Sequence, residues 1–269
     1  MSKDYQGFFG LSGRAFNKSI DAGAVYRYPQ LQELHYYLQA AVADGAVAVV
    51  TGPVGAGKST ALRVFLSELD PTRHTVLYVG YTSSDRALFR ELAHGLGVSP
   101  AYLKGDLLVQ LHATIEHLWL SKQRSTLLVV DDAHLLSDSL LSELRQMLNY
   151  QMDAATPLGL ILVGQPPLHA KLKEPQHEAL AQRTLIRYSL AGLSRTEATD
   201  YVDTHMRAVG GDPGVFTKEA LDLAYQQAKG VPREFGNFCV YALIRAAWKE
   251  VKTVDRQLMA EVIQAQRGG

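Results

Sequence analysis

The sequence predicts an α/β protein whose five-stranded parallel sheet is followed by a small, purely helical C-terminal segment. Short apolar runs of strand length alternate with helical stretches as far as Gly192. Beyond that residue the strand-like runs stop, and only helical periodicity continues. Strands that alternate with helices are typical of a parallel sheet covered on both faces. We therefore expect an N-terminal arm (1–29), an α/β core (30–192) and a helical lid subdomain (193–269).

The spacing of apolar residues predicts the elements of the arm and core. The arm is rich in aromatic residues and glycine, which indicates little helix. Leu31, Leu34, Leu38 and Val42 recur at helical spacing and predict a helix from Gln30 to Asp44. The expected strands are Ala46–Val50, Thr75–Val79, Thr126–Val130, Leu158–Val163 and Leu185–Ser189. The expected helices between them lie near Ser59–Leu69, Asp85–Gly95, Asp106–Lys122 and Ser139–Met152.

Four helices account for the lid segment. They are expected at Ser194–Val209, Thr217–Lys229, Pro232–Lys249 and Asp255–Gln266. Ser194 and Glu197 have the spacing of a capping box, which marks the start of the first helix. The glycine pair at 210–211 and the Asp-Pro-Gly sequence at 212–214 are turn signals that end it.

Composition excludes several classes of protein. Lys plus Arg and Asp plus Glu both number 27, so the formal net charge is zero and a heavily basic nucleic-acid binder is excluded. Cys239 is the only cysteine, which rules out an intramolecular disulfide framework and favours a reducing compartment. The start is not a secretory signal, and no apolar run approaches the roughly 18 residues that span a bilayer. We expect a soluble cytoplasmic protein without a membrane anchor.

A glycine-rich loop lies between the first expected strand and the following helix. Residues 51–60 read TGPVGAGKST and contain the pattern G-x-x-x-x-G-K-S. Glycines let successive backbone N–H groups surround a phosphate, a lysine adds a positive charge, and a serine hydroxyl can bind Mg²⁺. A plain glycine-rich turn is the alternative, but the context and spacing both match, so we predict ATP and Mg²⁺ as cofactors. The predicted nucleotide-binding residues are Gly52, Pro53, Val54, Gly55, Ala56, Gly57, Lys58, Ser59 and Thr60, with Ser59 also a metal ligand.

A pair of carboxylates follows the third expected strand. Residues 127–134 read LLVVDDAH, so Asp131 and Asp132 lie where a buried strand reaches the carboxyl edge of the sheet. Ligands of doubly wound sheets bind at that edge. We expect Asp131 to reach Mg²⁺, and Asp132 to polarise the attacking water. The alternative for both is that they cap the next helix. His134 is interpreted as a packing or hydrogen-bonding residue rather than a metal ligand.

Three further polar residues are candidates for contacting the phosphates. Gln165 follows the fourth strand at the same edge and suits the γ-phosphate or the lytic water, or it is a turn residue before two prolines. Arg183 precedes the last strand, and its guanidinium suits bidentate phosphate contact from an outward position towards a neighbouring subunit. Arg233 lies in the first turn of a helix that begins at Pro232, within reach of the γ-phosphate. For both arginines the alternative is an ordinary surface residue.

Together these residues resemble an AAA+ ATPase with a helical lid, and the resemblance covers nearly the whole chain. More narrowly, the opening FFGLSGRAF resembles the start of the ExeA-type bacterial ATPases. The motifs DDAHLL, LRQMLNYQMD, LVGQPPL and ALAQR continue that resemblance. It implies that Asp132, Gln165, Arg183 and Arg233 are the catalytic, first-sensor, finger and second-sensor residues. Asp132 departs from the usual glutamate, which puts the hydrolysis rate in question, and Ala15–Phe16 stands where the family usually has Pro-Phe.

Two branches of that family share the opening signature. The secretion ATPases carry a transmembrane helix and a peptidoglycan-binding region after the ATPase core, and the chain of 269 residues has neither. The other branch comprises transposition regulators similar to TniB, TnsC and MuB, and the short chain favours it. That resemblance implies a homo-oligomer, a ring or a helical filament, that assembles on double-stranded DNA and recruits a DDE transposase, with a target-selector protein as a further partner. The alternative is a secretion or pilus-assembly ATPase lacking its anchor, and a third class is a signalling switch.

Sequence-independent DNA binding would have to come from a few cations repeated in an oligomer, because the chain has no basic run. The loop after the second strand and the segment at 102–106 are expected on one side of the fold. We predict that Arg86 and Lys104 contact phosphates and that Tyr81, Thr82 and Ser83 add hydrogen bonds. The alternative is that all five are solvated loop residues.

Overall fold

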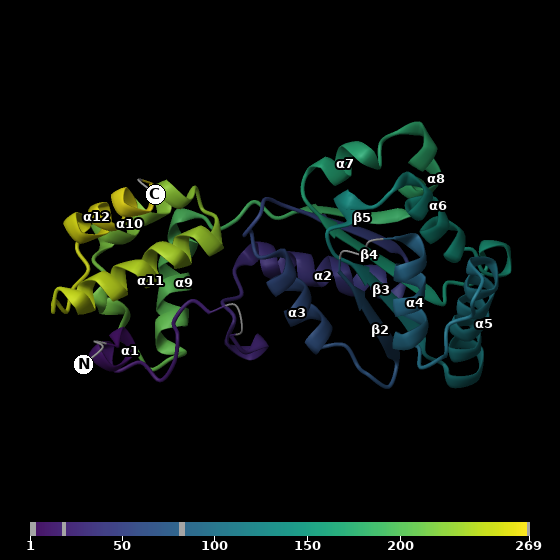
Figure 1. Ribbon diagram of the computed structural model, residues 1–269, viewed down its shortest axis with the longest axis horizontal. Coiled ribbons are helices and arrows are strands. Elements are labelled where there is room, and N and C mark those ends of the chain that lie inside the picture. Colours follow the sequence, from purple (N-terminus) through teal and green to yellow (C-terminus); the bar gives the residue numbers. More distant parts are fainter. Residues whose placement is uncertain (1–3, 18–19, 81–83, 268–269) are drawn as a thin grey trace. The chain divides into compact units, whose positions relative to one another are not determined.

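The computed structural model describes residues 4–17, 20–80 and 84–267 (Figure 1). The chain forms two compact units, which we treat separately. The sheet unit comprises residues 32–52 and 65–190, and the lid unit comprises residues 1–31, 53–64 and 191–269. The N-terminal arm and part of the phosphate loop thus group with the C-terminal helices. The division into arm, core and lid at the bounds given above remains a prediction.

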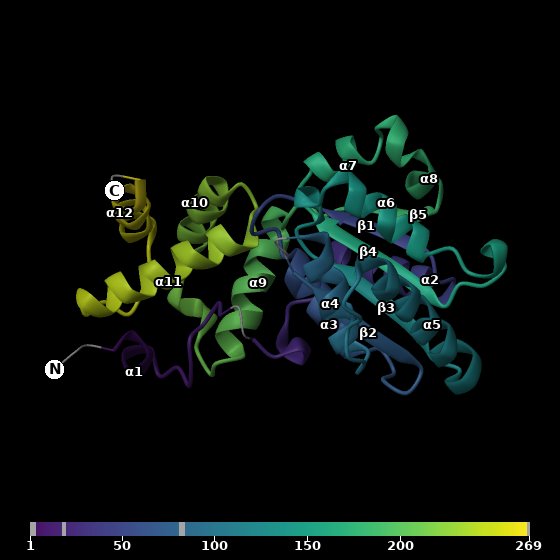
Figure 2. The same cartoon turned by 45° about the vertical axis from the view of Figure 1, so that its right-hand side comes forward.

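The sheet unit contains a five-stranded sheet in which every neighbouring pair is parallel (Figure 2). Its strands are β1 (Val47–Thr51), β2 (His74–Val79), β3 (Ser125–Val130), β4 (Leu158–Gly164) and β5 (Thr184–Ser189). Their order is β2-β3-β4-β1-β5, so β1 lies inside the sheet and β2 and β5 form its edges. The predicted five-stranded parallel sheet is confirmed.

The strand register fixes what lies at each end of β1. Thr51, the last residue of β1, pairs with Gly164 of β4 and Ser189 of β5. At the opposite end, Val47 pairs with Leu160 and Thr184. Gly52 follows directly on Thr51, so the phosphate loop begins at the carboxyl end of β1.

Buried apolar side chains from strands and helices form the core of this unit. Its helices are α4 (Asp85–Gly95), α5 (Lys104–Lys122), α6 (Asp138–Met147), α7 (Pro167–Lys171) and α8 (Glu178–Gln182). In α4, Leu88, Phe89 and Leu92 are almost completely buried, as expected for residues one helical turn apart. They belong to one cluster with Val130 of β3 and Leu160 of β4. Burial of each such side chain contributes about 2 kcal/mol.

The helix predicted to reach Met152 ends at Met147 instead. The following residues form a 3-10 turn, Gln151–Asp153, in which Gln151 and Met152 have φ angles of 47° and 56°. Left-handed backbone at two consecutive residues is incompatible with a right-handed helix. Met152 is left 96% exposed at this turn.

The lid unit is helical. Its helices are α1 (Tyr5–Phe9), α9 (Arg195–Arg207), α10 (Lys218–Ala228), α11 (Pro232–Trp248) and α12 (Arg256–Arg267). Ser194 and Glu197 form the predicted capping box, and Pro232 begins α11 as predicted. Two more helices, α2 (Pro29–Ala43) and α3 (Lys58–Ser67), each have residues in both units. Across the described ranges, no helix is both long and apolar enough to cross a membrane.

Candidate functional site

The phosphate loop has the backbone that its glycines predict. Gly55 and Gly57 have φ angles of 85° and 96°, which L side chains rarely adopt. A Cβ atom on Gly55 would also lie 2.9 Å from Arg233 Cβ and from Val231 Cγ1. Glycine is therefore required at position 55 both for its conformation and for the close approach of α11.

Lys58 and Ser59 open α3 directly after the loop. Lys58 is only 9% exposed, and its ammonium donates to the carbonyl oxygen of Pro53 at 3.0 Å. The lysine charge is thus held against the loop, next to the N-terminus of a helix, where backbone N–H groups favour an anion. Ser59 is exposed at this helix start. Its hydroxyl is an oxygen ligand of the kind that Mg²⁺ prefers.

Two other segments of the lid unit lie against the loop. The backbone N–H of Arg233 donates to the carbonyl of Gly55 at 3.2 Å, and the Arg233 side chain is exposed in the first turn of α11. From the arm, the hydroxyl of Tyr28 donates to the carbonyl of Ala56 at 3.4 Å. Burial, with the charge of Glu197 nearby, raises the pKa of Tyr28 to about 12, so the phenol keeps its proton. The sequence predicted Arg233 but not Tyr28.

In the sheet unit, Asp131 and Asp132 follow β3 at its carboxyl end. The N–H of Asp131 donates to Val79 of β2 at 2.9 Å, which extends the pairing one residue beyond the strands. Asp131 Oδ1 accepts the N–H of Asp132 at 2.9 Å, and Oδ2 accepts the hydroxyl of Tyr78 at 2.8 Å. Asp132 has left-handed backbone (φ 50°, ψ 32°), and its side chain is 52% exposed. The chain turns here, so the two adjacent carboxylates have different surroundings.

His134 connects the acidic segment to Gln165. Its Nε2 lies 3.0 Å from the side-chain amide nitrogen of Gln165, and its Nδ1 accepts the Gln165 N–H at 3.4 Å. The same Nδ1 lies 4.0 Å from Asp132 Oδ1. The structure therefore brings Asp132, His134 and Gln165 together. It also agrees with the interpretation of His134 as a hydrogen-bonding residue.

The carboxyl end of β1 is held by His169. The buried hydroxyl of Thr51 lies 2.7 Å from His169 Nε2, and it also donates to the carbonyl of Tyr188 at 3.4 Å. Burial and the charges of Lys173 and Arg187 lower the pKa of His169, so the ring is neutral near pH 7. The residue before the phosphate loop is thus tied to α7 and β5. No sequence motif marked this histidine.

Arg183 lies at the amino end of β1, whereas Thr51 lies at its carboxyl end. Its carbonyl accepts the N–H of Val47, the first residue of β1, at 3.4 Å. Its guanidinium donates to the carbonyl of Leu148 at 3.0 Å. The side chain is half buried and lines a cavity of about 280 Å³ together with Leu148, and its contact with a neighbouring subunit stays a prediction. Thr51 is four residues further along β1, about 13 Å away at 3.3 Å per residue.

The residues predicted to contact DNA are only partly described. Tyr81, Thr82 and Ser83 lie outside the described residues. Arg86 is exposed, and its guanidinium donates to the carbonyl of Tyr102. The guanidinium carbon also lies over the Tyr102 ring, 5.1 Å from the ring centroid. Lys104 forms ion pairs with Glu143 at 2.5 Å and with Asp85 at 3.7 Å. The two predicted segments therefore meet, but the charge of Lys104 is balanced within the protein.

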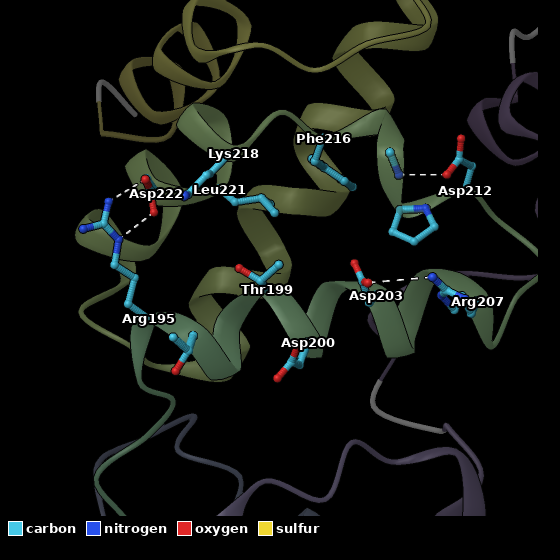
Figure 3. A pocket seen from close by; sticks show the side chains of 13 residues that line it. Arg195, Thr199, Asp200, Asp203, Arg207, Asp212, Phe216, Lys218, Leu221 and Asp222 are labelled. Atoms are coloured by element: carbon cyan, nitrogen blue, oxygen red, sulfur yellow. Dashed lines mark hydrogen bonds and ion pairs between the residues drawn. The ribbon is translucent and has the colours of Figure 1, made fainter.

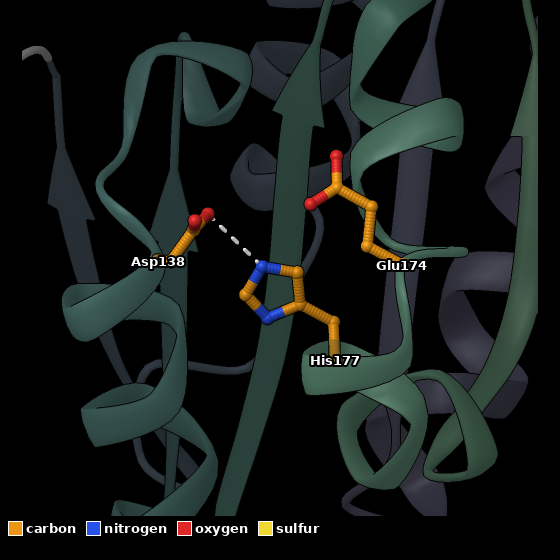
Figure 4. A group of neighbouring side chains, drawn as sticks. All are labelled: Asp138, Glu174 and His177. Atoms are coloured by element: carbon orange, nitrogen blue, oxygen red, sulfur yellow. Dashed lines mark hydrogen bonds and ion pairs between the residues drawn. The ribbon is translucent and has the colours of Figure 1, made fainter.

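A separate cluster of Asp138, Glu174 and His177 lies in the sheet unit, with its ligand atoms within 4.8 Å of one another (Figure 4). Asp138 Oδ1 lies 3.1 Å from His177 Nε2 and 3.4 Å from the ammonium of Lys171. The hydrogen bond from His177, followed by Lys171, lowers the pKa of Asp138. These partners satisfy the carboxylate, so the cluster ties the start of α6 to the segment before α8.

A groove of about 1050 Å³ in the lid unit runs between α9 and α10 (Figure 3). Its charges are largely paired with one another. Arg195 binds Asp222 at 2.5 Å, and Arg207 lies 3.9 Å from Asp203. Both signs of charge line this surface, and its arginines are not available as a strongly basic patch.

Comparison with known proteins agrees with this geometry. Residues 42–172 match the family model described as an AAA domain. General secretion pathway protein A of Aeromonas hydrophila is 30% identical over 246 residues, which are 90% of this chain and 45% of that protein. The chain thus spans about half the length of the curated relative it matches.

Solved structures share the fold at low sequence identity. The Aeropyrum pernix ORC1 protein in complex with DNA is 16% identical, with a TM-score of 0.67 over 90% of this chain and 65% of that one. Cdc6p from Pyrobaculum aerophilum is 20% identical, with a TM-score of 0.65 over 89% and 67%. The RuvB Holliday junction branch migration motor of Thermotoga maritima is 15% identical, with a TM-score of 0.55 over 87% and 68%.

The parallel sheet has the phosphate loop at the end of β1, and residues 42–172, which contain this loop, match the AAA domain family. The chain has the P-loop AAA+ fold and is an ATP-hydrolysing enzyme. More particularly, it is a homologue of the secretion-pathway protein named above.

Proposed function

We propose that this ATPase is a nucleotide-dependent switch in which Lys58 binds the β- and γ-phosphates and Arg233 contacts the γ-phosphate from the lid. Ser59 and Asp131 are the proposed Mg²⁺ ligands, and both offer the oxygen atoms that this cation prefers. Bound Mg²⁺ neutralises the charge that develops on the phosphates. Asp132 orients the attacking water, and Gln165 contacts the γ-phosphate or that water.

Hydrolysis in this proposal needs a second copy of the chain. The observation that carries the argument concerns the two ends of β1. Arg183 lies at the amino end, and the phosphate loop begins after the carboxyl end. The ends of β1 are about 13 Å apart, and the guanidinium of Arg183 binds the carbonyl of Leu148 instead of its own loop. Arg183 is therefore proposed to complete the site of a neighbouring subunit, where an arginine stabilises the charge of phosphoryl transfer.

Mixing two inactive variants tests this arrangement. Lys58→Ala should not bind ATP, and Arg183→Ala should bind ATP but lose roughly a thousandfold in turnover. A mixture should regain hydrolysis, because Arg183 of a Lys58→Ala subunit can serve an intact loop next to it. Turnover per subunit of the parent should also rise with protein concentration. If the mixture stays inactive and the parent turnover does not depend on concentration, Arg183 does not act between subunits.

The assembled ATPase is further proposed to act in the cytoplasm, where it binds duplex DNA without sequence preference and recruits a DDE transposase with a target selector. The sequence resemblance to transposition regulators supports this role. The fold is also shared with an ORC1 protein studied in complex with DNA. Because Lys104 is paired with Glu143 and Asp85, Arg86 should carry more of the phosphate contact than Lys104.

DNA binding measured by anisotropy, with ATP or ADP over a salt series, tests this role. ATP should strengthen binding, and the double variant Arg86→Ala, Lys104→Ala should weaken it for all sequences and flatten the salt dependence. Arg90→Ala is a suitable control, since Arg90 is another exposed arginine of α4. Equal binding with ADP and ATP would argue against the switch, and an unaffected double variant would argue against this surface.

A secretion ATPase is the second candidate, and the 30% identity to general secretion pathway protein A favours it. In that case the ATPase cycle would act on a partner of the cell envelope rather than on DNA. The same anisotropy experiment separates the two candidates. An ATPase that assembles with ATP but does not bind duplex DNA at low salt would support the secretion role.

A further inference from the structure

Tyr78 binds the carboxylate that is proposed to hold the metal. It lies on the edge strand β2, between the buried residues Leu77 and Val79, and its side chain is 50% exposed on the other face of the strand. The phenol hydroxyl donates to Asp131 Oδ2 at 2.8 Å. No sequence motif identified this tyrosine.

The strand register explains why a tyrosine at this position reaches Asp131. Tyr78 pairs with Val129 of β3, and Asp131 follows two residues later on the same face. With strands about 4.8 Å apart and a rise of about 3.3 Å per residue, such neighbours are about 8 Å apart, a distance that only a long side chain spans. The bond from the Asp131 N–H to Val79 keeps the two backbones in register at this point.

The carboxylate of Asp131 is held on both of its oxygens. Oδ1 accepts the backbone N–H of Asp132, and Oδ2 accepts the hydroxyl of Tyr78. One donor lies on β2 and the other in the turn after β3, so together they restrain the rotation of the carboxylate as well as its position. A carboxylate offers about four lone-pair directions, which leaves capacity for a metal ion or its water.

We infer that Tyr78 is a positioning residue that holds Asp131 in the orientation that receives Mg²⁺. The inference rests on the proposed role of Asp131 as a metal ligand. Without the phenol oxygen, the carboxylate loses the hydrogen bond from β2 that restrains Oδ2. Mg²⁺ demands nearly ideal octahedral geometry, so a less restrained ligand binds it more weakly.

Tyr78→Phe removes one oxygen and keeps the ring, so strand packing is retained. The affinity for a fluorescent ATP analogue is measured in EDTA and over a series of Mg²⁺ concentrations. Affinity without Mg²⁺ should equal that of the parent. The Mg²⁺ concentration giving half of the metal-dependent gain in affinity should rise roughly tenfold, as expected for loss of one hydrogen bond to a charged group.

Control variants separate this inference from the proposed function. Tyr36→Phe changes a tyrosine of α2 that is 70% exposed and should leave the Mg²⁺ titration unchanged. Asp131→Asn should weaken the Mg²⁺ dependence at least as much as Tyr78→Phe. Lys58→Ala should lose affinity with and without Mg²⁺, and if it does not, the proposed nucleotide site itself is wrong.

Two results for Tyr78→Phe would overturn the inference. One is a Mg²⁺ titration that coincides with that of the parent while Asp131→Asn is impaired. The other is an equal loss of affinity with and without Mg²⁺, accompanied by a lower melting temperature, which indicates a structural role for the tyrosine.

Discussion

The backbone N–H of Arg233 donates to the carbonyl of Gly55, so the first turn of α11 lies directly on the phosphate loop. Arg233, 178 positions later in the sequence, therefore limits the size of the residue that fits at position 55. The Arg233 side chain remains exposed, as its proposed contact with the γ-phosphate requires.

Gly55→Ala should disturb the loop through both its backbone and its packing. The added Cβ would face Arg233 and Val231 at 2.9 Å, and the φ angle of 85° is strained for alanine. We expect a loss of about 1–3 kcal/mol in unfolding free energy, together with weaker ATP binding. Val54→Ala, at an exposed neighbour, is the control for thermal unfolding. Equal melting temperatures for Gly55→Ala and the parent would contradict the described packing.

Asp132→Asn should leave ATP affinity unchanged and lower turnover by a hundredfold or more, the usual contribution of a general base. Asparagine tolerates the left-handed backbone at this position as well as aspartate does, so folding should be preserved. Single-turnover hydrolysis and nucleotide binding measure the two effects separately. Asp132→Glu restores the residue that is usual in the resembled family and should raise turnover. Hydrolysis at the parent rate in the asparagine variant would assign the role to another residue.

His134 and Gln165 should act as one unit, because each supplies hydrogen bonds to the other. We expect His134→Ala and Gln165→Ala to lower turnover by similar factors, and the double variant to be little worse than either single one. A double-mutant cycle on turnover measures this coupling. Additive effects would mean that the contact between these side chains does not contribute to hydrolysis.

His205 should make the lid unit sensitive to acid. Burial lowers its pKa from 6.5 to about 4, and its Nδ1 has no hydrogen-bond partner among the described residues. The folded state therefore prefers the neutral ring. Its stabilising contribution is complete above pH 6.5 and is lost as the pH falls towards 4. The loss amounts to about 3 kcal/mol from the linkage between pKa and unfolding.

Urea unfolding between pH 7.5 and pH 4.5 tests this prediction. His205→Phe keeps an aromatic ring beside Phe16 and Tyr201 and should lose stability less steeply on acidification than the parent. His94→Gln, at an exposed histidine of α4, should follow the parent curve. Parallel pH profiles for the parent and His205→Phe would show that this histidine does not set the acid sensitivity.

Patterns of neighbouring residues correctly predicted the strands and the starts of two lid helices. The capping box at Ser194, the helix start at Pro232 and the alternation of strands and helices all depend on residues close together in the chain. The early end of α6 could not be predicted in this way, because the spacing of apolar residues does not indicate the left-handed backbone at Gln151 and Met152.

The parts of the candidate site that the sequence missed depend on pairing between distant segments. Tyr78 reaches Asp131 only because β2 and β3 pair in one particular register. Tyr28 contacts Ala56 because the arm packs in the lid unit, and His169 contacts Thr51 because α7 returns to the end of β1. Such contacts require the strand order and the course of the chain, which apolar periodicity does not contain.

The placement of Arg183 and the phosphate loop at opposite ends of β1 gives each subunit a direction. If the arginine serves the neighbour, subunits associate head to tail, and such contacts close into rings or continue as filaments. In a ring every bound nucleotide has a neighbouring arginine. In an open filament the subunit at one end always lacks it, so ATP there outlasts ATP in the interior. The two ends of such a filament would therefore differ in how long they retain ATP, because Arg183 and the phosphate loop lie at opposite ends of β1.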